Sequence, residues 1–398
     1  MLRDRFEAPN FGKLFEDGFG EIEYHDNYKF SIVKSRVIEI FKKNYTWRKQ
    51  NFNLTNVTVI FQLFNRPYYF GPIFLEFSRL VTGCKFLISD ASQSQSRIFH
   101  QKIIAAAKNI NPTLDIEYFE LDEKISAYKN LGILINKVST KYCIKFDDDD
   151  FLNPAALLEA REELDQKSDV VAVHGRMLNF RVDKELVTLI PAIRTWANSD
   201  DIIQNLNMIA LQGGINWQIM VRTKSLLQAF SRLRFTTPEA PDMLFDHLLH
   251  LYLAFDGKIE MTSGIFGFVR RGQRDTAIVQ NRYLTDYMLD RYHYPDFFTY
   301  FTAFHDHLYQ KFISAGASAG QAIKFSNNTT RFVVSSITHD ASSINILTRS
   351  KKKDYFFYID YNNIAPEIYT SHQEVFFYFL KTLSAQQLLA QQQEPAPV

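Results

Sequence analysis

Between residues 57 and 146 the sequence alternates short apolar segments with helical ones, and this order limits the possible folds more than any other feature. The first apolar segment, Val57 to Phe64, is nearly continuous and rich in β-branched residues, as is typical of a strand buried on both faces. Further strands are expected at 85–89, 115–121 and 142–146, with helices at 72–81, 94–109 and 125–138. The alternation predicts an α/β protein with an open, doubly wound parallel sheet.

Four consecutive aspartates, Asp147 to Asp150, follow the last of these strands. Adjacent carboxylates repel one another unless water or a cation screens them. In open parallel sheets ligands bind beyond the carboxyl ends of the strands, and polar residues follow two other strands at Asn65-Arg66 and at Asp90. A bound divalent cation would explain the acidic run, and a solvated acidic turn is the alternative. Mg²⁺ and Mn²⁺ prefer such oxygen ligands, usually one or two carboxylates completed by phosphate oxygens and waters.

Composition narrows the class of protein further. The 398 residues, 46% of them hydrophobic, allow one large domain with an appendage or two domains. The net charge is +1 and the basic residues are dispersed, so we expect no nucleic-acid partner. Cys84 and Cys143 form neither a metal-binding spacing nor a disulfide framework, which fits a reducing compartment. Without a signal-peptide pattern or a bilayer-spanning apolar segment, we expect a soluble cytoplasmic protein, and peripheral membrane contact through an aromatic surface stays open.

Four short motifs occur along the predicted sheet domain. They are Asn65-Arg66-Pro67, Ser89-Asp90-Ala91-Ser92, Lys129-Asn130-Leu131-Gly132 and the acidic run after Phe146. In this order and at these separations they resemble the motifs of a GT-A fold glycosyltransferase of the family 2 type, over residues 54–275. The sequence departs from that pattern at Ser89, Ala91 and Lys129, where an acid, a glycine and an arginine are common. No GxGxxG or GxxxxGK[ST] loop is present, so a metal would have to carry the charge of a pyrophosphate.

The resemblance implies a role for each matching residue. Asp90 would contact the nucleoside base, and an Asx turn is the alternative. Asp147 would lie near the ribose or the metal, and Asp149 would ligate Mn²⁺ or Mg²⁺. Asp148 and Asp150 would support them, because neighbouring side chains on an extended segment alternate sides.

Further residues of the nucleotide-sugar site follow from the same resemblance. They are Asn65, Arg66, Lys129, Asn130, Arg270 and Arg271. Arg270 or Arg271 would close over the diphosphate, since arginine suits phosphate bidentately. For Lys129 and Asn130 a solvated helix face is an equal alternative.

Candidates for catalysis and acceptor binding lie later in the chain. The family places an acid eleven residues before a glycine that ends a helix, which makes Asp246 the candidate base, with Asp242 one turn earlier in reserve. Trp217 offers a flat face for a sugar, with a core tryptophan as the alternative. His174 could face the acceptor, although a hydrogen-bonded structural histidine is the favoured reading.

The sequence therefore predicts a metal-dependent glycosyltransferase that moves a sugar from a nucleotide diphosphate, expected to be UDP, to a hydroxyl of a glycan or lipid-linked glycan. An aspartate base implies inversion, and retention stays open. Expected domains are an extension at 1–53 with a helix at 30–41, the GT-A domain at 54–275, and a helical C-terminal region at 276–398. The alternatives are an inactive GT-A-like glycan-binding or scaffold protein, or a nucleotidyltransferase, which the missing Gly-rich loop disfavours. The oligomeric state is not indicated.

Overall fold

The computed structural model describes residues 22–26, 29–33, 51–183, 186–191, 197–212, 218–233, 242–270, 297–337 and 379–386. Its strands are β1 (Ile22–Asp26), β2 (Lys29–Val33), β3 (Phe52–Asn53), β4 (Val57–Leu63), β5 (Val81–Thr82), β6 (Lys85–Asp90), β7 (Asp115–Glu120), β8 (Tyr142–Phe146), β9 (Phe151–Leu152), β10 (Val170–Asp183), β11 (Leu186–Pro191), β12 (Met220–Arg222) and β13 (Lys258–Arg270). Its helices are α3 (Pro67–Leu80), α4 (Ser94–Ile110), α5 (Ala127–Ile135), α6 (Pro154–Gln166), α7 (Ile202–Gln212), α8 (Thr223–Leu233), α9 (Asp242–Asp256), α12 (Phe297–Ser314) and α13 (Ala319–Ile337). Residues 379–386 form one more helix, called the C-terminal helix below.

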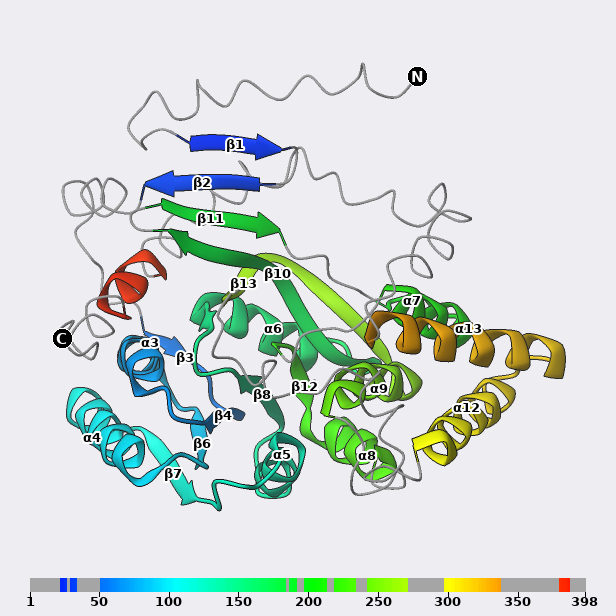
Figure 1. Cartoon of the computed structure of the whole chain (residues 1–398), viewed down its shortest axis with the longest axis horizontal. Coiled ribbons are helices and arrows are strands. Elements are labelled where there is room, and N and C mark those ends of the chain that lie inside the picture. Colours follow the sequence, from blue (N-terminus) through cyan, green and yellow to red (C-terminus); the bar gives the residue numbers. More distant parts are fainter. Residues whose placement is uncertain are drawn as a thin grey trace, which may run out of the picture.

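One large sheet carries the fold, in the order β1-β2-β11-β10-β12-β8-β4-β6-β7 (Figure 1). The four strands β8, β4, β6 and β7 are parallel neighbours, which confirms the predicted α/β fold class. Beyond β8 the sheet continues through antiparallel pairs, and β13 pairs parallel with β10. The sequence did not predict this antiparallel extension.

The strands of the parallel core are apolar because both of their faces are covered. Along β4, Val59 and Phe61 belong to one hydrophobic cluster, which also contains residues of α3, α4 and α6. Ile60, between them, belongs to a second cluster, with residues of α5, α7, α8 and α9. Successive side chains of a strand point to opposite faces, so one continuous apolar run supplies both cores.

Much of the high aromatic content of the chain lies in this core. Phe61 contacts the rings of Phe70, Phe74 and Phe146 at centroid distances of 5.4, 5.7 and 5.1 Å. All four side chains are fully buried. Burying each such ring contributes about 1.5–3 kcal/mol, and paired rings add about 0.5–1.5 kcal/mol beyond area burial. These contacts fix α3 against the central strand and thereby hold the start of α3 at the carboxyl edge of the sheet.

The expected helix at 30–41 is wrong for its first residues. Residues 29–33 form β2, which pairs antiparallel with β1 and with β11. The open edge of β11 offers backbone hydrogen bonds to an extended segment, and this tertiary partner overrides the helical spacing of the side chains. Residues 34–41 lie outside the described part of the chain. The division into three domains stays a prediction, although β1 and β2 join the same sheet as the strands of the predicted GT-A domain.

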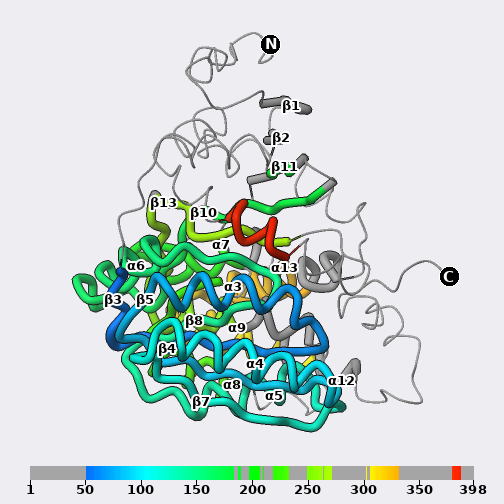
Figure 2. Tube along the Cα trace, turned by 90° about the vertical axis from the view of Figure 1, so that its left-hand side faces the viewer, coloured from blue at the N-terminus to red at the C-terminus, as the bar shows by residue number. Residues whose placement is uncertain are grey.

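The C-terminal region provides helices on two sides of the molecule. Helices α12 and α13 contribute Leu308, Phe312 and Ala322 to the second cluster. The C-terminal helix lies between α3 and the β10–β11 hairpin, as both views show (Figures 1 and 2). Its Phe379 stacks on Phe268 of β13 with ring centroids 4.0 Å apart, which joins it to the first cluster. Across the described segments, no helix is both long and apolar enough to cross a membrane.

Candidate active site

The acidic run connects β8 to β9, beyond the carboxyl end of a parallel strand. The backbone turns here, with the Asp150 amide donating to the Asp147 carbonyl at 3.3 Å. Asn153 anchors the far end of the loop: its side chain accepts from the Ala155 amide at the start of α6 and donates to the Ile265 carbonyl of β13 at 2.9 Å. The sequence Asn-Pro therefore forms an N-cap followed by a first-turn proline.

Arg66 holds two of the four carboxylates. Its guanidinium donates through Nε and Nη2 to Asp148 and through Nη1 to Asp149, the last at 3.1 Å. Asp148 is almost entirely buried, whereas the side chain of Asp149 keeps 11% of its surface exposed. The bidentate contact makes Asp148 the firmer partner of the two.

The other two carboxylates have different partners. Asp147 is the most open of the four, with 40% of its side chain exposed, and it pairs with Lys145. Asp150 is buried and accepts from the Arg270 amide at 3.1 Å. The Gln218 side chain donates to both Asp147 and Asp150. The run is thus divided into two carboxylates with exposed surface, Asp147 and Asp149, and two that are enclosed.

Burial dominates the electrostatics of the run. It raises the pKa of Asp148 to about 7, against the lowering effect of Arg66, and it raises the pKa of Asp149 and Asp150 as well. Burial by itself would lower the pKa of Arg66, but the nearby carboxylates raise it above its ordinary value. Carboxylates crowded into so dry a place gain from any further positive charge that reaches them.

Asn65 and Arg66 form the turn that brings the arginine to the run. Asn65 has φ +55°, a left-handed conformation that asparagine tolerates better than most residues. Its amide donates to the Ser92 hydroxyl, and its side chain accepts from the Gln93 amide at the start of α4, both at 2.8 Å. Asn65 therefore links the end of β4 to the end of β6 by hydrogen bonds. The neighbouring residue, Phe64, has 43% of its surface exposed.

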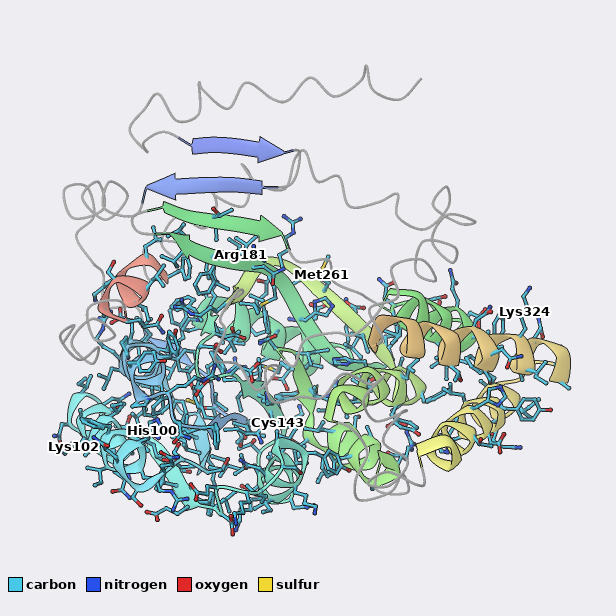
Figure 3. The ribbon with its side chains drawn as sticks, viewed as in Figure 1. His100, Lys102, Cys143, Arg181, Met261 and Lys324 are labelled. Carbon is cyan, nitrogen blue, oxygen red and sulfur yellow. The ribbon has the colours of Figure 1, made fainter. Side chains whose placement is uncertain are left out.

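The predicted base-contacting residue, Asp90, is enclosed. Its carboxylate accepts from the Ser92 amide at 2.9 Å, from Nδ1 of His100 at 2.8 Å and from the Tyr118 hydroxyl at 2.6 Å. Neither Asp90 nor His100 has exposed surface; Figure 3 shows His100 on α4. The Ser92 contact is the Asx turn considered as the alternative. Burial raises the pKa of Asp90, but these hydrogen bonds outweigh it and hold the pKa below its usual value.

Lys129 and Asn130 lie in the first turn of α5, which Ser126 caps. The Lys129 side chain is exposed. Asn130 is buried, and its Oδ1 atom has no hydrogen-bond partner among the described residues. A buried carbonyl oxygen without a donor is costly, which makes Asn130 the stronger candidate of the two for contact with a ligand hydroxyl.

Arg270, the last residue of β13, lies close enough to Asp149 and Asp150 for both to affect its pKa, although burial is the larger effect and lowers it.

His174 lies inside β10 with no exposed surface, and its Nδ1 is 3.2 Å from the Gly175 carbonyl oxygen, the position of a structural histidine. Asp242 is the first residue of α9 and Asp246 follows one turn later. The side chains of both, and all of Trp217 and Arg271, lie outside the described residues.

The carboxylates of Asp147 and Asp149, which keep 40% and 11% of their side-chain surface exposed, fit a divalent metal of the Mg²⁺ or Mn²⁺ type in their chemistry. Within the described ranges, no group of three or more His, Cys, Asp or Glu side chains is arranged to hold a metal ion. Two carboxylates are nevertheless the usual protein contribution when phosphate oxygens and waters complete the shell. The donor set therefore suits a metal that binds together with a diphosphate.

Three residues of this site were missed in the sequence. Lys145 and Gln218 contact the acidic run, and Phe64 is exposed at the carboxyl end of β4. Lys145 had a signal, since a lysine within an otherwise apolar strand one residue before Phe146 needs an acidic partner. Gln218 had none, because its partners are 68 or more positions away.

Comparison with known proteins finds solved structures with a similar fold. No protein-family model matches the sequence, and no curated protein matches it. The solved structure of TarS residues 1–349 from S. aureus in complex with UDP-GlcNAc matches with a TM-score of 0.50 and 11% identity, over 72% of this chain and 74% of that one. The mannosyltransferase PcManGT from Pyrobaculum calidifontis, in complex with GDP-Man and Mn²⁺, matches over 89% of this chain and 92% of that one, with 11% identity. Its TM-score is only 0.41, so nothing is concluded from it.

The chain therefore has the α/β fold of GT-A-like glycosyltransferases, with a large central sheet. At 11% identity the likeness concerns the fold, and the chemistry has to be argued from the site itself.

Proposed function

We propose that the protein is a metal-dependent glycosyltransferase that transfers a sugar from a nucleotide diphosphate donor, expected to be a UDP-sugar, to a hydroxyl of a glycan or lipid-linked glycan. The observation that carries the proposal is the division of the acidic run at the carboxyl end of β8. Asp147 and Asp149 keep part of their side-chain surface exposed, while Asp148 and Asp150 are enclosed and bonded to Arg66, Gln218 and the backbone. Such an arrangement suits cation binding better than a solvated turn, in which all four carboxylates would face water.

Side chains around the run supply groups that a nucleotide needs. Phe64 presents an exposed ring on which a base can stack, a contact worth about 1–3 kcal/mol for a base on an aromatic side chain. Asn130 offers an unpaired carbonyl oxygen that suits a ribose hydroxyl. Arg66, Arg270 and Arg271 are the proposed diphosphate contacts, with Lys129 in reserve at the exposed start of α5. Asp90 enters the proposal mainly as a buried support, because a base could reach its carboxylate only if the network with His100 opened.

The proposed chemistry separates proton transfer from stabilisation of the leaving group. Asp246 accepts the proton of the attacking hydroxyl, with Asp242 as the alternative base, and this gives inversion at the anomeric carbon. A bound Mn²⁺ or Mg²⁺ would supply a Lewis acid for the departing diphosphate. The arginines hold the phosphate oxygens, where preorganised positive charge favours the transition state. Trp217 is the proposed acceptor platform, and the buried position of His174 leaves it a supporting role in β10.

One experiment tests this proposal. The protein is incubated with a panel of sugar nucleotides and Mn²⁺ or Mg²⁺, and nucleotide release is followed with and without candidate acceptors. Asp149→Asn should remove metal-dependent release, and Asp246→Asn should abolish transfer while donor binding is retained. Asp306→Asn, at an exposed position of α12, is the matched control and should behave as the intact protein.

The results can also refute the proposal. If the intact protein neither binds nor turns over any nucleotide sugar, it is not a glycosyltransferase, and the inactive glycan-binding alternative is favoured. If Asp242→Asn abolishes transfer and Asp246→Asn does not, the base lies one turn earlier on α9. Incorporation of a nucleotide, rather than a sugar, into the product would identify a nucleotidyltransferase.

A further inference from the structure

Arg270 is held by residues that lie far apart in the sequence. Its guanidinium carbon is 4.7 Å from the centroid of the Tyr69 ring on α3 and 4.7 Å from that of the Phe180 ring on β10. Its Nη2 donates to Oε1 of Gln386 on the C-terminal helix at 2.6 Å, across 116 positions of sequence. Its backbone amide donates to Asp150. Arg270 thus connects the acidic run, through its backbone, to the C-terminal helix, through its side chain.

Gln386 makes a second contact with the same group of residues. Its Nε2 donates to the Tyr69 carbonyl oxygen at 2.9 Å, so one buried amide fixes both the guanidinium and one of the two rings beside it. The C-terminal helix is itself anchored, by Phe379 in the first hydrophobic cluster and by the Lys381–Glu76 ion pair at 3.3 Å. The position of Gln386 therefore follows from packing of the whole helix.

The charge of Arg270 is not neutralised by this arrangement. In the part of the chain that the structure describes, no carboxylate forms an ion pair with Arg270, and its buried Nε has no hydrogen-bond partner. Its side-chain hydrogen-bond partner is a neutral amide and aromatic faces flank it. Burial lowers its pKa, while Asp149 and Asp150 lie close enough to raise it without forming an ion pair with it. A largely buried cation without an anionic partner is costly, and a guanidinium suits phosphate oxygens best. The site is therefore preorganised for an anion.

We propose that Gln386 is a positioning residue that holds Arg270 for binding of the donor's diphosphate, so that the C-terminal helix forms part of the donor site. The neutrality of Gln386 is essential, because a carboxylate at this position would also accept from the guanidinium but would neutralise its charge, and it could not donate to the Tyr69 carbonyl oxygen. The identity of the anion rests on the proposed function. The anion site itself does not, since inorganic pyrophosphate can be used as a probe.

Two substitutions of Gln386 separate positioning from simple structural support. Binding of UDP with Mn²⁺, and of inorganic pyrophosphate, is measured by calorimetry on the full chain. Gln386→Ala should weaken both about tenfold, the equivalent of one hydrogen bond to a charged group. Gln386→Glu keeps an acceptor for Arg270 but loses the donor to the Tyr69 carbonyl oxygen, so it should weaken both at least as much as Gln386→Ala does, while its melting temperature stays at or above that of Gln386→Ala. Ser384→Ala is the control, because that hydroxyl bonds only within the helix, to the Leu380 carbonyl.

The outcomes distinguish this inference from the proposed function. If Gln386→Glu binds both probes as tightly as the intact protein, or if the intact protein binds neither, the inference is overturned. This test does not depend on Gln386→Ala, so it can be made even if that variant fails to fold. Pyrophosphate binding that depends on Gln386, without binding or turnover of any nucleotide sugar, would support the anion site and refute the glycosyltransferase. If sugar transfer and donor affinity are unchanged in both variants, the glycosyltransferase is supported and the role of Gln386 in the anion site is refuted.

Discussion

The enclosed carboxylate of Asp90 gives a prediction whose size follows from the structure. Asp90→Asn keeps the shape of the side chain and the oxygen that accepts from the Ser92 amide. The new amide nitrogen cannot accept from His100 or Tyr118, so the buried His100 and the partly buried Tyr118 lose an anionic acceptor. Each such bond is worth about 1.5–3 kcal/mol, and a change of His100 tautomer can recover one of them. We expect the free energy of unfolding to fall by about 2–4 kcal/mol.

The pH dependence of this loss has a definite sign. The folded pKa of Asp90 lies below its ordinary value, so the aspartate stabilises the fold fully above about pH 4 and less as the pH falls through the folded pKa. Urea unfolding of both proteins at pH 5 and 3.5 should show a smaller difference at the lower value. The other titratable groups that face the carboxylate are His100 and Tyr118, and Tyr118→Phe should give a smaller loss with the same trend.

The same variant decides between two roles for Asp90. If its carboxylate supports the fold, UDP affinity should change less than twofold, whereas a base contact would lower it by at least tenfold, the effect of about 1.4 kcal/mol. Unchanged stability together with a large loss of UDP affinity would refute the structural reasoning. A stability difference that persists undiminished at pH 3.5 would refute the assigned cause.

Three further predictions concern other parts of the molecule. Phe64→Ala should weaken UDP binding about tenfold in calorimetry without changing the melting temperature, because the ring is 43% exposed and available for stacking. Gly132→Ala should lower the free energy of unfolding by about 1–3 kcal/mol in urea titration, because its new methyl group would lie 2.8 Å from the Phe230 ring. Cys84 and Cys143 should resist alkylation at pH 8 until the protein unfolds, as mass spectrometry can follow, because burial raises the pKa of each thiol to about 12.

Each of these has a simple control. Gly320→Ala, in α13, places its methyl group in open space and should not destabilise the protein. Phe99→Ala removes an equally exposed ring, 41%, from α4 and should leave UDP binding unchanged. Rapid labelling of either cysteine in the folded protein would contradict its burial. Cys143, labelled in Figure 3, lies in β8, and Cys84 directly precedes β6, with β4 between the two strands; both cysteines are free.

The parallel half of the fold could be predicted because its signals are local. Val57 to Leu63 must be buried on both faces whatever surrounds it, and the Asn153-Pro154 pair specifies a helix start without reference to the rest of the chain. The N-terminal strand β2 could not be predicted, since four of its residues pair with β11 only because the hairpin β10–β11 places an open edge there. The spacing of side chains does not indicate backbone pairing of that kind.

The same distinction applies to the site. The acidic run was evident because four adjacent carboxylates are unusual in any environment. Gln218 and Gln386 were not, because a glutamine carries no signal until the fold places it against an acid or an arginine. The region 276–398 was expected to be helical and to pack on the sheet domain, and its C-terminal helix belongs to the first hydrophobic cluster. What sequence reasoning lacked was the tertiary neighbours of otherwise ordinary polar residues.

The pairing of Arg66 explains how four clustered acids are compatible with a stable fold and with a metal. Arg66 makes two bonds to Asp148 but only one to Asp149, so the contact with Asp149 can be given up while the arginine remains bound. Asp150, held by Gln218 and a backbone amide, needs no cation. Removing Arg66 altogether would leave Asp148 buried and unpaired, a change that costs about 3–5 kcal/mol for a buried pair. The arginine therefore serves the stability of Asp148 and leaves Asp149 as the carboxylate from which a proposed metal displaces the fewest bonds.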